Sequence, residues 1–183
     1  MIKNVLVFIA NGTEEIEAVV FIDIMRRAGM NVTVVGETDI VHCSRDVKII
    51  PDLPLHKLNE NKLYDLIYLP GGSKGVENLM NIPKVELILK NHKENNKKIA
   101  AICAAPTILD FFNIFEKDAK ITSHPSVANI LQKYNYSENK VVESHNIISS
   151  RGAGTVFDLS FYIIEQLLGQ ETAQKIKDSI VYK

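Results

Sequence analysis

Short hydrophobic stretches alternate along this chain with longer segments of helical periodicity. Buried strands are expected where apolar residues run together, and amphipathic helices where apolar residues recur with the period of a helix. The predicted strands are residues 5–10, 31–36, 66–69, 99–102, 119–123 and 147–150. The predicted helices are residues 14–28, 84–95, 126–133 and 156–168, with a short hairpin at 41–50.

This alternation of strands and helices predicts an α/β fold. Strands that are apolar throughout are typical of a mostly parallel central sheet with helices on both faces, here a flavodoxin-like doubly wound sandwich. The 183 residues are 46% hydrophobic, enough for one substantial core, so residues 1–183 are predicted to form a single domain. In such sheets ligands bind beyond the carboxyl ends of the strands, and the loops there are the candidate site.

Charge and cysteine content narrow the classes of function. The 21 lysine and arginine residues nearly balance the 22 aspartate and glutamate residues, so neither a nucleic acid nor an anionic membrane is an expected partner. The first hydrophobic stretch is too short for the core of a signal peptide. Two cysteines do not make a disulfide framework and fit a reducing compartment, so a cytoplasmic location is expected.

Metal and nucleotide sites are not predicted. Neither cysteine has a Cys or His neighbour at ligand spacing, and the five histidines show no such spacing either. Residues 151–155 resemble a phosphate-binding turn but lack the glycine spacing of a dinucleotide fingerprint. We therefore expect a site that uses neither a metal nor a cofactor.

Cys103 is the most informative residue of the chain. It follows the predicted strand 99–102 and precedes a helix whose first turn Pro106 favours, so its thiol lies on a sharp strand-to-helix turn among small alanines. A helix N-terminus stabilises a thiolate, and the pKa of Cys103 is expected to fall. The alternative is a buried, inert cysteine, because apolar surroundings raise a thiol pKa.

Glu17 lies on the apolar side of the first predicted helix. It shares a face with Val20, Phe21 and Ile24, and that face is expected to pack on the sheet. Burial raises a carboxyl pKa, so Glu17 is expected to stay protonated near neutral pH and to donate a hydrogen bond or a proton. The alternative is a carboxylate satisfied by backbone donors.

Two further loops supply candidate groups. Gly71 and Gly72 follow a predicted strand and Pro70, a sequence typical of a tight turn whose backbone N–H groups form an oxyanion hole, although an ordinary turn also fits. His124 follows another predicted strand, where it is either a general acid or base or a hydrogen-bonded loop residue.

These features occur together in a known family. Glu17, the Pro-Gly-Gly turn, Cys103, His124 and residues 150–152 resemble, in this order, motifs of the parkinsonism-associated protein deglycase family, within the ThiJ/PfpI superfamily. The resemblance runs from the first strand to Lys183 and implies the class I glutamine amidotransferase-like form of the sandwich.

The resemblance implies a role for each site residue. Cys103 would be a reactive, oxidisable thiolate, Glu17 its protonated hydrogen-bond partner and His124 a neighbouring assistant. The backbone N–H groups of Gly72 and Ala104 would contact the reacting oxygen.

The resemblance also implies a homodimer. The positions that match Arg27 and Arg45 lie toward the family's interface, with Glu15 nearby. The chain departs from the animal members in two places, where Ala153 replaces a proline and Ile50 replaces a cysteine. The first change alters the shape of the expected pocket, and the second removes a redox-sensitive thiol.

The function that the resemblance implies is cofactor-independent chemistry on small dicarbonyls. A cysteine nucleophile would convert methylglyoxal and glyoxal, or their early adducts on proteins and nucleotides, to lactate or glycolate. Ala104 stands where proteases of the superfamily carry a histidine, so no protease dyad is expected. The alternative is a redox sensor or redox-regulated chaperone, in which Glu17 stabilises a sulfinic acid on Cys103.

Overall fold

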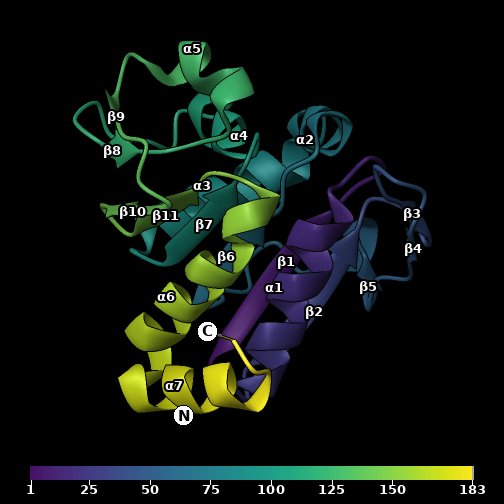
Figure 1. Cartoon of the computed structure of the whole chain (residues 1–183). Coiled ribbons are helices and arrows are strands. Elements are labelled where there is room, and N and C mark those ends of the chain that lie inside the picture. The colour runs from purple at the N-terminus through teal and green to yellow at the C-terminus, as the bar shows by residue number, and fades with distance from the viewer. Residues whose placement is uncertain (183) are drawn as a thin grey trace.

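A computed structural model describes residues 1–182, and a seven-stranded sheet lies at its centre (Figure 1). Its strands follow the order β10-β11-β7-β6-β1-β2-β5, and all neighbours pair in parallel except β10 and β11, which are antiparallel. The mostly parallel sheet that the sequence predicts is confirmed. The bounds are β1 Asn4–Ile9, β2 Asn31–Gly36, β5 Leu53–Pro54, β6 Leu66–Leu69, β7 Lys98–Ile102, β10 Val141–Ser144 and β11 Ile147–Ser150.

Helices cover both faces of this sheet (Figure 1). Three of them, α1, α6 and α7, pack on one face, and α2, α3 and α4 pack on the other. The long helices are α1 Glu15–Arg27, α3 Pro83–Glu94, α6 Val156–Leu168 and α7 Gln170–Ser179. The shorter helices are α2 Ser73–Met80, α4 Pro106–Phe111 and α5 Ala128–Leu131, with 3-10 turns at Leu55–Lys57, Pro125–Val127 and Ala153–Thr155. None of the helices within residues 1–182 has both the length and the hydrophobicity to cross a bilayer.

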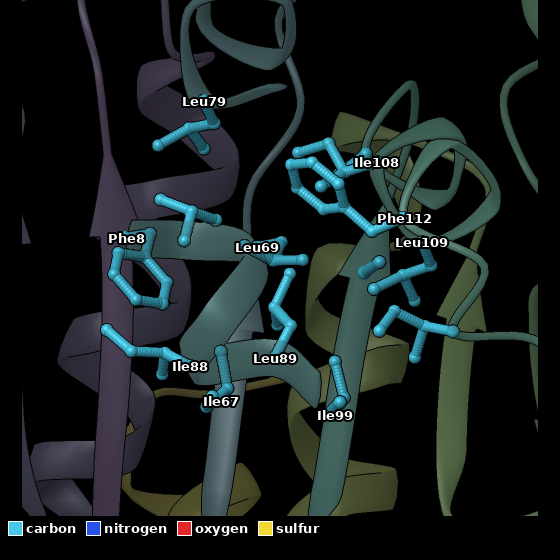
Figure 2. Packing of buried hydrophobic residues seen from close by; sticks show 14 of the residues in the cluster. Phe8, Ile67, Leu69, Leu79, Ile88, Leu89, Ile99, Ile108, Leu109 and Phe112 are labelled. Carbon is cyan, nitrogen blue, oxygen red and sulfur yellow. The ribbon is translucent and has the colours of Figure 1, made fainter. Parts of the chain in front are cut away.

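The strands are apolar on both sides because each contributes to two cores. In β1, Val5 and Val7 belong to the core with α1 and α6, whereas Leu6 and Phe8 belong to the core with α3 and α4, and all four are fully buried. Figure 2 shows part of the second core, where side chains from the strands meet those of the covering helices. Each fully buried side chain of this size contributes about 1.5–3 kcal/mol of hydrophobic stabilisation.

The helices predicted at 14–28, 84–95 and 156–168 correspond to α1, α3 and α6 within two residues at each end. The predicted hairpin is present as β3 Val41–His42 and β4 Lys48–Ile49, which pair antiparallel.

Two predictions on the segment before β10 are wrong in extent. The strand predicted at 119–123 is reduced to β8 Lys120–Ile121, which pairs with β9 Asn135–Tyr136 in a separate small sheet. It does not join the main sheet, because β10 holds the place beside β11. The helix predicted at 126–133 is split into a 3-10 turn and the short α5.

The sheet order brings the candidate loops together. The strands β11, β7, β6 and β1 are consecutive neighbours, and their carboxyl ends lead to Gly152, Cys103, Gly71 and the start of α1. In doubly wound sheets this edge is where ligands bind. The segments chosen from the sequence therefore converge at one end of the sheet.

Candidate active site

Cys103 lies on the turn between β7 and α4 with a φ of 63°. A non-glycine residue in this region is strained by about 1–3 kcal/mol, so the surrounding structure must hold it there. Its N–H donates to the carbonyl of Ser150 at 3.0 Å, and its carbonyl accepts from the N–H of His124 at 2.9 Å. These two bonds tie the turn to both neighbouring loops, as expected for a nucleophile held in a fixed position.

Two glycines make room beside the cysteine. A Cβ atom on Gly71 would lie 2.6 Å from Cβ of Cys103 and 2.7 Å from Oε2 of Glu17. Gly72 has a φ of 91°, and a Cβ atom there would lie 2.2 Å from the carbonyl oxygen of Gly12. Neither position accepts a side chain, so the turn after β6 can approach the thiol only as Gly-Gly.

The side chain of Glu17 is fully buried on the first turn of α1. Its Oε2 accepts the N–H of Gly71 at 2.7 Å, and its backbone carbonyl accepts the hydroxyl of Tyr68 at 3.0 Å. Within residues 1–182, Oε1 makes no hydrogen bond in this geometry, although the carboxyl group and the thiol of Cys103 are close enough to shift each other's pKa. A proton on Oε1 would give the carboxyl group a donor to offer the sulfur.

Burial raises the pKa of Glu17 to about 7. The hydrogen bond from the Gly71 N–H and the nearby Cys103 thiol oppose this rise in pKa, and the negative charge of Glu14 adds to it. Desolvation disfavours the ionised carboxylate more than these two groups stabilise it. The expected protonation of Glu17 near neutral pH therefore has a physical cause in the structure.

The pKa of Cys103 moves in the opposite direction from the one expected. Burial raises it to about 12, and the charge and proximity of the Glu17 carboxyl group raise it further. The nearby backbone N–H groups of Ala104 and Gly72 lower it by less. The expected fall in pKa is wrong because α4 has only six residues, and its N-terminus cannot offset burial beside an ionised carboxylate.

The thiol and the carboxyl group therefore titrate as a pair. Their first proton leaves near pH 7, and the second leaves only when the pair must hold two negative charges. Between these steps one proton serves two sites, Cys103 Sγ and Glu17 Oε1. With the proton on Glu17, the sulfur carries the negative charge and no longer faces an ionised carboxylate.

The backbone N–H groups of Gly71, Gly72 and Ala104 face different groups. That of Gly71 is engaged by Glu17, so it holds the carboxyl group in place rather than facing a reacting oxygen. Those of Gly72 and Ala104 lie near the Cys103 thiol and lower its pKa. They are positioned to stabilise negative charge on the sulfur or on an oxygen bonded next to it.

His124 is exposed and follows β8 at the rim of the site. Its Nδ1 accepts the backbone N–H of Ser126 at 3.2 Å and lies 2.8 Å from the hydroxyl of Ser126. A backbone N–H can only donate, so Nδ1 is unprotonated and Nε2 carries the proton of the neutral ring. A Cβ atom on Gly152 would lie 3.4 Å from Cδ2 of His124 and 3.9 Å from Sγ of Cys103, so both side chains border the same space.

This space belongs to a cavity of about 280 Å³ at the carboxyl end of the sheet. Its size suits a small molecule of a few heavy atoms, and its walls carry both polar and apolar groups. No group of three or more His, Cys, Asp or Glu side chains within residues 1–182 is placed to hold a metal ion. The cavity is lined by Glu14, Glu17, Ser44, Arg45, Gly72, Ser73, Cys103, Ala104, His124, Ser126 and Ala153.

The residues expected near a dimer interface occupy different environments. Glu15 is buried, and its carboxylate accepts the N–H of Arg45 at 2.8 Å and the hydroxyl of Ser44 at 2.7 Å. Burial alone would raise the pKa of Glu15, but these and further backbone hydrogen bonds hold it below the ordinary value. The side chain of Arg45 is exposed at the cavity, and Arg27 is exposed and paired with Asp23 at 2.6 Å.

Sequence reasoning missed the serines that organise the site. Ser44 bridges Glu14 and Glu15, and Ser126 fixes the ring of His124. Ser126 could have been found, because a serine two residues after a histidine at the start of a turn is a common local partner. Ser44 lies in the hairpin loop, and nothing in the local pattern joins that loop to α1.

The sequence and the fold of this chain are similar to those of known proteins. The model of the DJ-1/PfpI family matches residues 3–166. The chain is 40% identical to the Parkinson disease protein 7 homolog of Danio rerio, covering 99% of this chain and 98% of that protein. It is 34% identical to the glutathione-independent glyoxalase DJR-1.2 of Caenorhabditis elegans, covering 89% and 87%. The crystal structure of Drosophila melanogaster DJ-1beta matches with a TM-score of 0.95 and 36% identity over the whole of both chains.

The family model covers most of the sequence, and the relatives align along nearly its full length. Four of the residues that carry the resemblance, Glu17, Gly72, Cys103 and His124, line one cavity at the carboxyl end of the sheet. The chain belongs to the DJ-1/PfpI family.

Proposed function

We propose that this protein is a glutathione-independent glyoxalase, with deglycase activity on early dicarbonyl adducts as the same chemistry on a larger substrate. The observation that carries the proposal is the pairing of Cys103 with a fully buried Glu17, whose pKa is raised to about 7, inside a cavity of about 280 Å³. A relative named as a glutathione-independent glyoxalase supports it.

The reaction begins when Cys103 attacks the aldehyde carbon of methylglyoxal. A carbon–sulfur bond forms, and the carbonyl electron pair moves onto the oxygen, which the N–H groups of Gly72 and Ala104 face. The oxygen then takes a proton, and the product of this step is a hemithioacetal. Glu17 is the proton donor within reach of the sulfur substituent, and His124 Nε2–H is the second donor at the rim.

Proton transfer then converts the hemithioacetal to a thioester. The Glu17 carboxylate removes the hydrogen from the carbon bonded to sulfur, and the resulting enediol is protonated at the neighbouring carbon. The former aldehyde carbon is thereby oxidised and the former ketone carbon reduced, with no external electron acceptor. Water cleaves the thioester, which releases lactate and restores the thiol.

The test follows methylglyoxal loss and lactate formation without glutathione and with a chelator present. We expect the parent and Cys43→Ser proteins to form lactate, and Cys103→Ser to form none above buffer, because only Cys103 borders the cavity. Lactate formation by folded Cys103→Ser would show that the nucleophile is wrongly assigned. A folded, reduced parent protein that forms no lactate would overturn the proposed activity.

A redox-sensing role is the second candidate function. The donors that surround Cys103 Sγ, from Gly72, Ala104 and a protonated Glu17, would equally stabilise the oxygens of a sulfinic acid. We expect mild peroxide to stop at this oxidation state in the parent protein. Mass spectrometry of the parent and Glu17→Leu proteins should give different product distributions, and identical ones would remove Glu17 from this role.

We propose a homodimer through the outer face of α1. Ile16, Val19 and Ile50 are large apolar side chains with 51%, 47% and 78% exposure, and Val19 and Ile50 line one hollow together with Asp23. Exposed apolar groups gathered in this way mark interaction surfaces. Sedimentation of the parent and Val19→Glu proteins tests the proposal, which requires a dimer in the first and a shift toward monomer in the second.

A further inference from the structure

A second hollow lies beside the cysteine pocket, between α2, α4 and α5, which gather at the same end of the sheet (Figure 1). It has a volume of about 380 Å³, within the range of small-molecule sites. We name it the α2/α4/α5 groove. Its lining residues are Ser73, Val76, Glu77, Met80, Ala104, Thr107, Asp110, Phe111, Val127 and Ile130.

The charged groups of this groove are already engaged. Glu77 pairs with Lys74 at 3.0 Å, and Asp110 accepts from Lys133 and from the hydroxyl of Tyr134, both at 2.7 Å. These bonds leave an apolar wall as the accessible surface. The groove therefore favours an uncharged hydrocarbon group over a polar one.

Two large apolar side chains of the groove are exposed. Phe111 on α4 is 60% exposed and Ile130 on α5 is 51% exposed, and the two helices pack against each other. Phe111 also presents a ring that meets Phe112 edge-on, with centroids 5.2 Å apart. An aromatic group placed in the groove would gain both burial and an aromatic contact.

The groove adjoins the cysteine pocket. Ser73 and Ala104 line both spaces, and Ala104 is the residue after Cys103 in the chain. The groove thus borders the pocket beside the residue that follows the nucleophile. For a 2-oxoaldehyde, the group that can enter the groove is the substituent on the ketone carbon.

We infer that the substrate class of this site is 2-oxoaldehydes with an aromatic substituent, whose ring occupies the α2/α4/α5 groove. This inference rests on the proposed function and names the substrate that the groove selects. The chemistry is unchanged: an arylglyoxal takes up water, its aldehyde carbon is oxidised to a carboxylate, its ketone carbon is reduced to an alcohol, and one proton is released.

The experiment compares initial rates with phenylglyoxal and methylglyoxal for the parent and three variants. We expect the parent to have the higher kcat/KM for phenylglyoxal. In Phe111→Ser and in Ile130→Ser, the ratio of phenylglyoxal to methylglyoxal kcat/KM should fall about tenfold, the size of effect that lost apolar contacts have on specificity. The matched control is Leu87→Ser, because Leu87 is 50% exposed on α3 outside the groove and should leave the ratio unchanged.

A second readout needs no turnover. Cys103 is alkylated with iodoacetanilide, which carries an aromatic ring, and with iodoacetamide, which does not. The ratio of the two rates should fall in the groove variants and not in Leu87→Ser. Equal ratios in Phe111→Ser, Ile130→Ser and Leu87→Ser in both readouts would overturn the inference. Absence of lactate from methylglyoxal would overturn the proposed function, and the alkylation ratio would still decide whether the groove takes an aromatic ring.

Discussion

The two cysteines of this protein both lie beside glutamate residues, but we expect only Cys103 to be reactive. Cys43 neighbours Glu14 and Glu15, and Cys103 neighbours Glu17. Burial and carboxylate charge raise both thiol pKa values, to about 11 for Cys43 and about 12 for Cys103. The thiol pKa alone does not distinguish the two sites.

The carboxyl groups make the difference. Glu15 accepts several hydrogen bonds, so its pKa is lowered and it faces Cys43 as a permanent negative charge. Glu17 is more deeply buried, and its pKa is raised to about 7. A carboxyl group that can hold a proton near neutral pH allows the neighbouring sulfur to hold the charge, whereas an ionised one forbids it.

Replacing Glu17 should make the environment of Cys103 resemble that of an ordinary buried thiol. Glu17→Gln keeps an acceptor for the Gly71 N–H but cannot exchange a proton. We expect lactate formation to fall by about 10²–10⁴-fold, the usual contribution of a general acid or base. Glu15→Gln is the control near Cys43 and should retain activity if it folds. If Glu17→Gln keeps activity within twofold of the parent in the same assay, Glu17 does not exchange the proton on which the reactivity of Cys103 depends.

His124 also lines the cavity, and its replacement should lower activity less than the replacement of Glu17 does. His124→Ala removes the Nε2–H donor at the rim but leaves the Cys103 and Glu17 pair intact. We expect a decrease in kcat of about 10²-fold, the lower end of general acid–base effects. Ser126→Ala retains the His124 ring but removes its hydroxyl partner. Its kcat should lie between those of the parent and His124→Ala. If His124→Ala loses as much as Glu17→Gln, the two residues act together in one proton transfer.

A methyl group on Gly152 would narrow the space between Cys103 and His124. Gly152→Ala would place Cβ 3.4 Å from the His124 ring and 3.9 Å from the sulfur, which are ordinary contacts that the fold tolerates. We expect the rate of Cys103 alkylation to fall by about threefold to tenfold, because approach to the sulfur is narrowed. Gly154→Ala has no atom within 4 Å of its added Cβ and is the matched control. Equal rates in both variants would place the approach to the sulfur elsewhere.

Acid stability limits the pH range in which the cysteines can be compared. His92 is fully buried and neutral, with Nε2 accepting the N–H of Tyr64 at 2.9 Å and Nδ1 lying 2.8 Å from the carbonyl of Ile88. Burial lowers the pKa of His92, so below about pH 6.5 the unfolded chain binds a proton that the folded chain does not, and stability falls as the pH falls.

Urea denaturation at several pH values measures this loss. The parent should lose more stability between about pH 7 and pH 5.5 than His92→Gln, which has no titrating ring. The exposed His56 offers the control, because His56→Gln should keep the slope of the parent. Parallel slopes in the parent and His92→Gln would assign the acid sensitivity to other groups.

Much of the fold could be predicted because its strands are apolar on both sides and its long helices are amphipathic. The elements that pattern reading missed have weaker signals. α2 begins directly after Gly72 and contains Gly75, a residue that is poor in helices but required here, since a Cβ atom would lie 2.7 Å from the N atom of Thr13. α7 is mostly polar: its apolar residues are Ala173, which is buried, and Ile176, which is partly buried.

The residues of the site could be predicted from the sequence, but the direction of the Cys103 pKa shift could not. Cys103 follows β7 and Glu17 follows β1, and the two strands are separated only by β6. Both residues therefore lie at the carboxyl end of the sheet, where the alternation of strands and helices predicts the site. The sign of the thiol shift depends on burial and on the distance to Glu17, and neither is visible in local sequence. The direction of the Gly71 N–H, toward Glu17, likewise depends on packing between α1 and the turn after β6.

The central claim is that Cys103 reacts as a thiolate because Glu17 takes the shared proton. The most direct measurement is the rate of limiting iodoacetamide alkylation at Cys103 and Cys43, mapped by mass spectrometry across pH. We expect Cys103 to be alkylated far faster than Cys43, with a rate that rises around the Glu17 pKa of about 7 and then levels off. Equal labelling of the two cysteines, or a Cys103 rate that begins to rise only above about pH 8, where an ordinary thiol ionises, would contradict it.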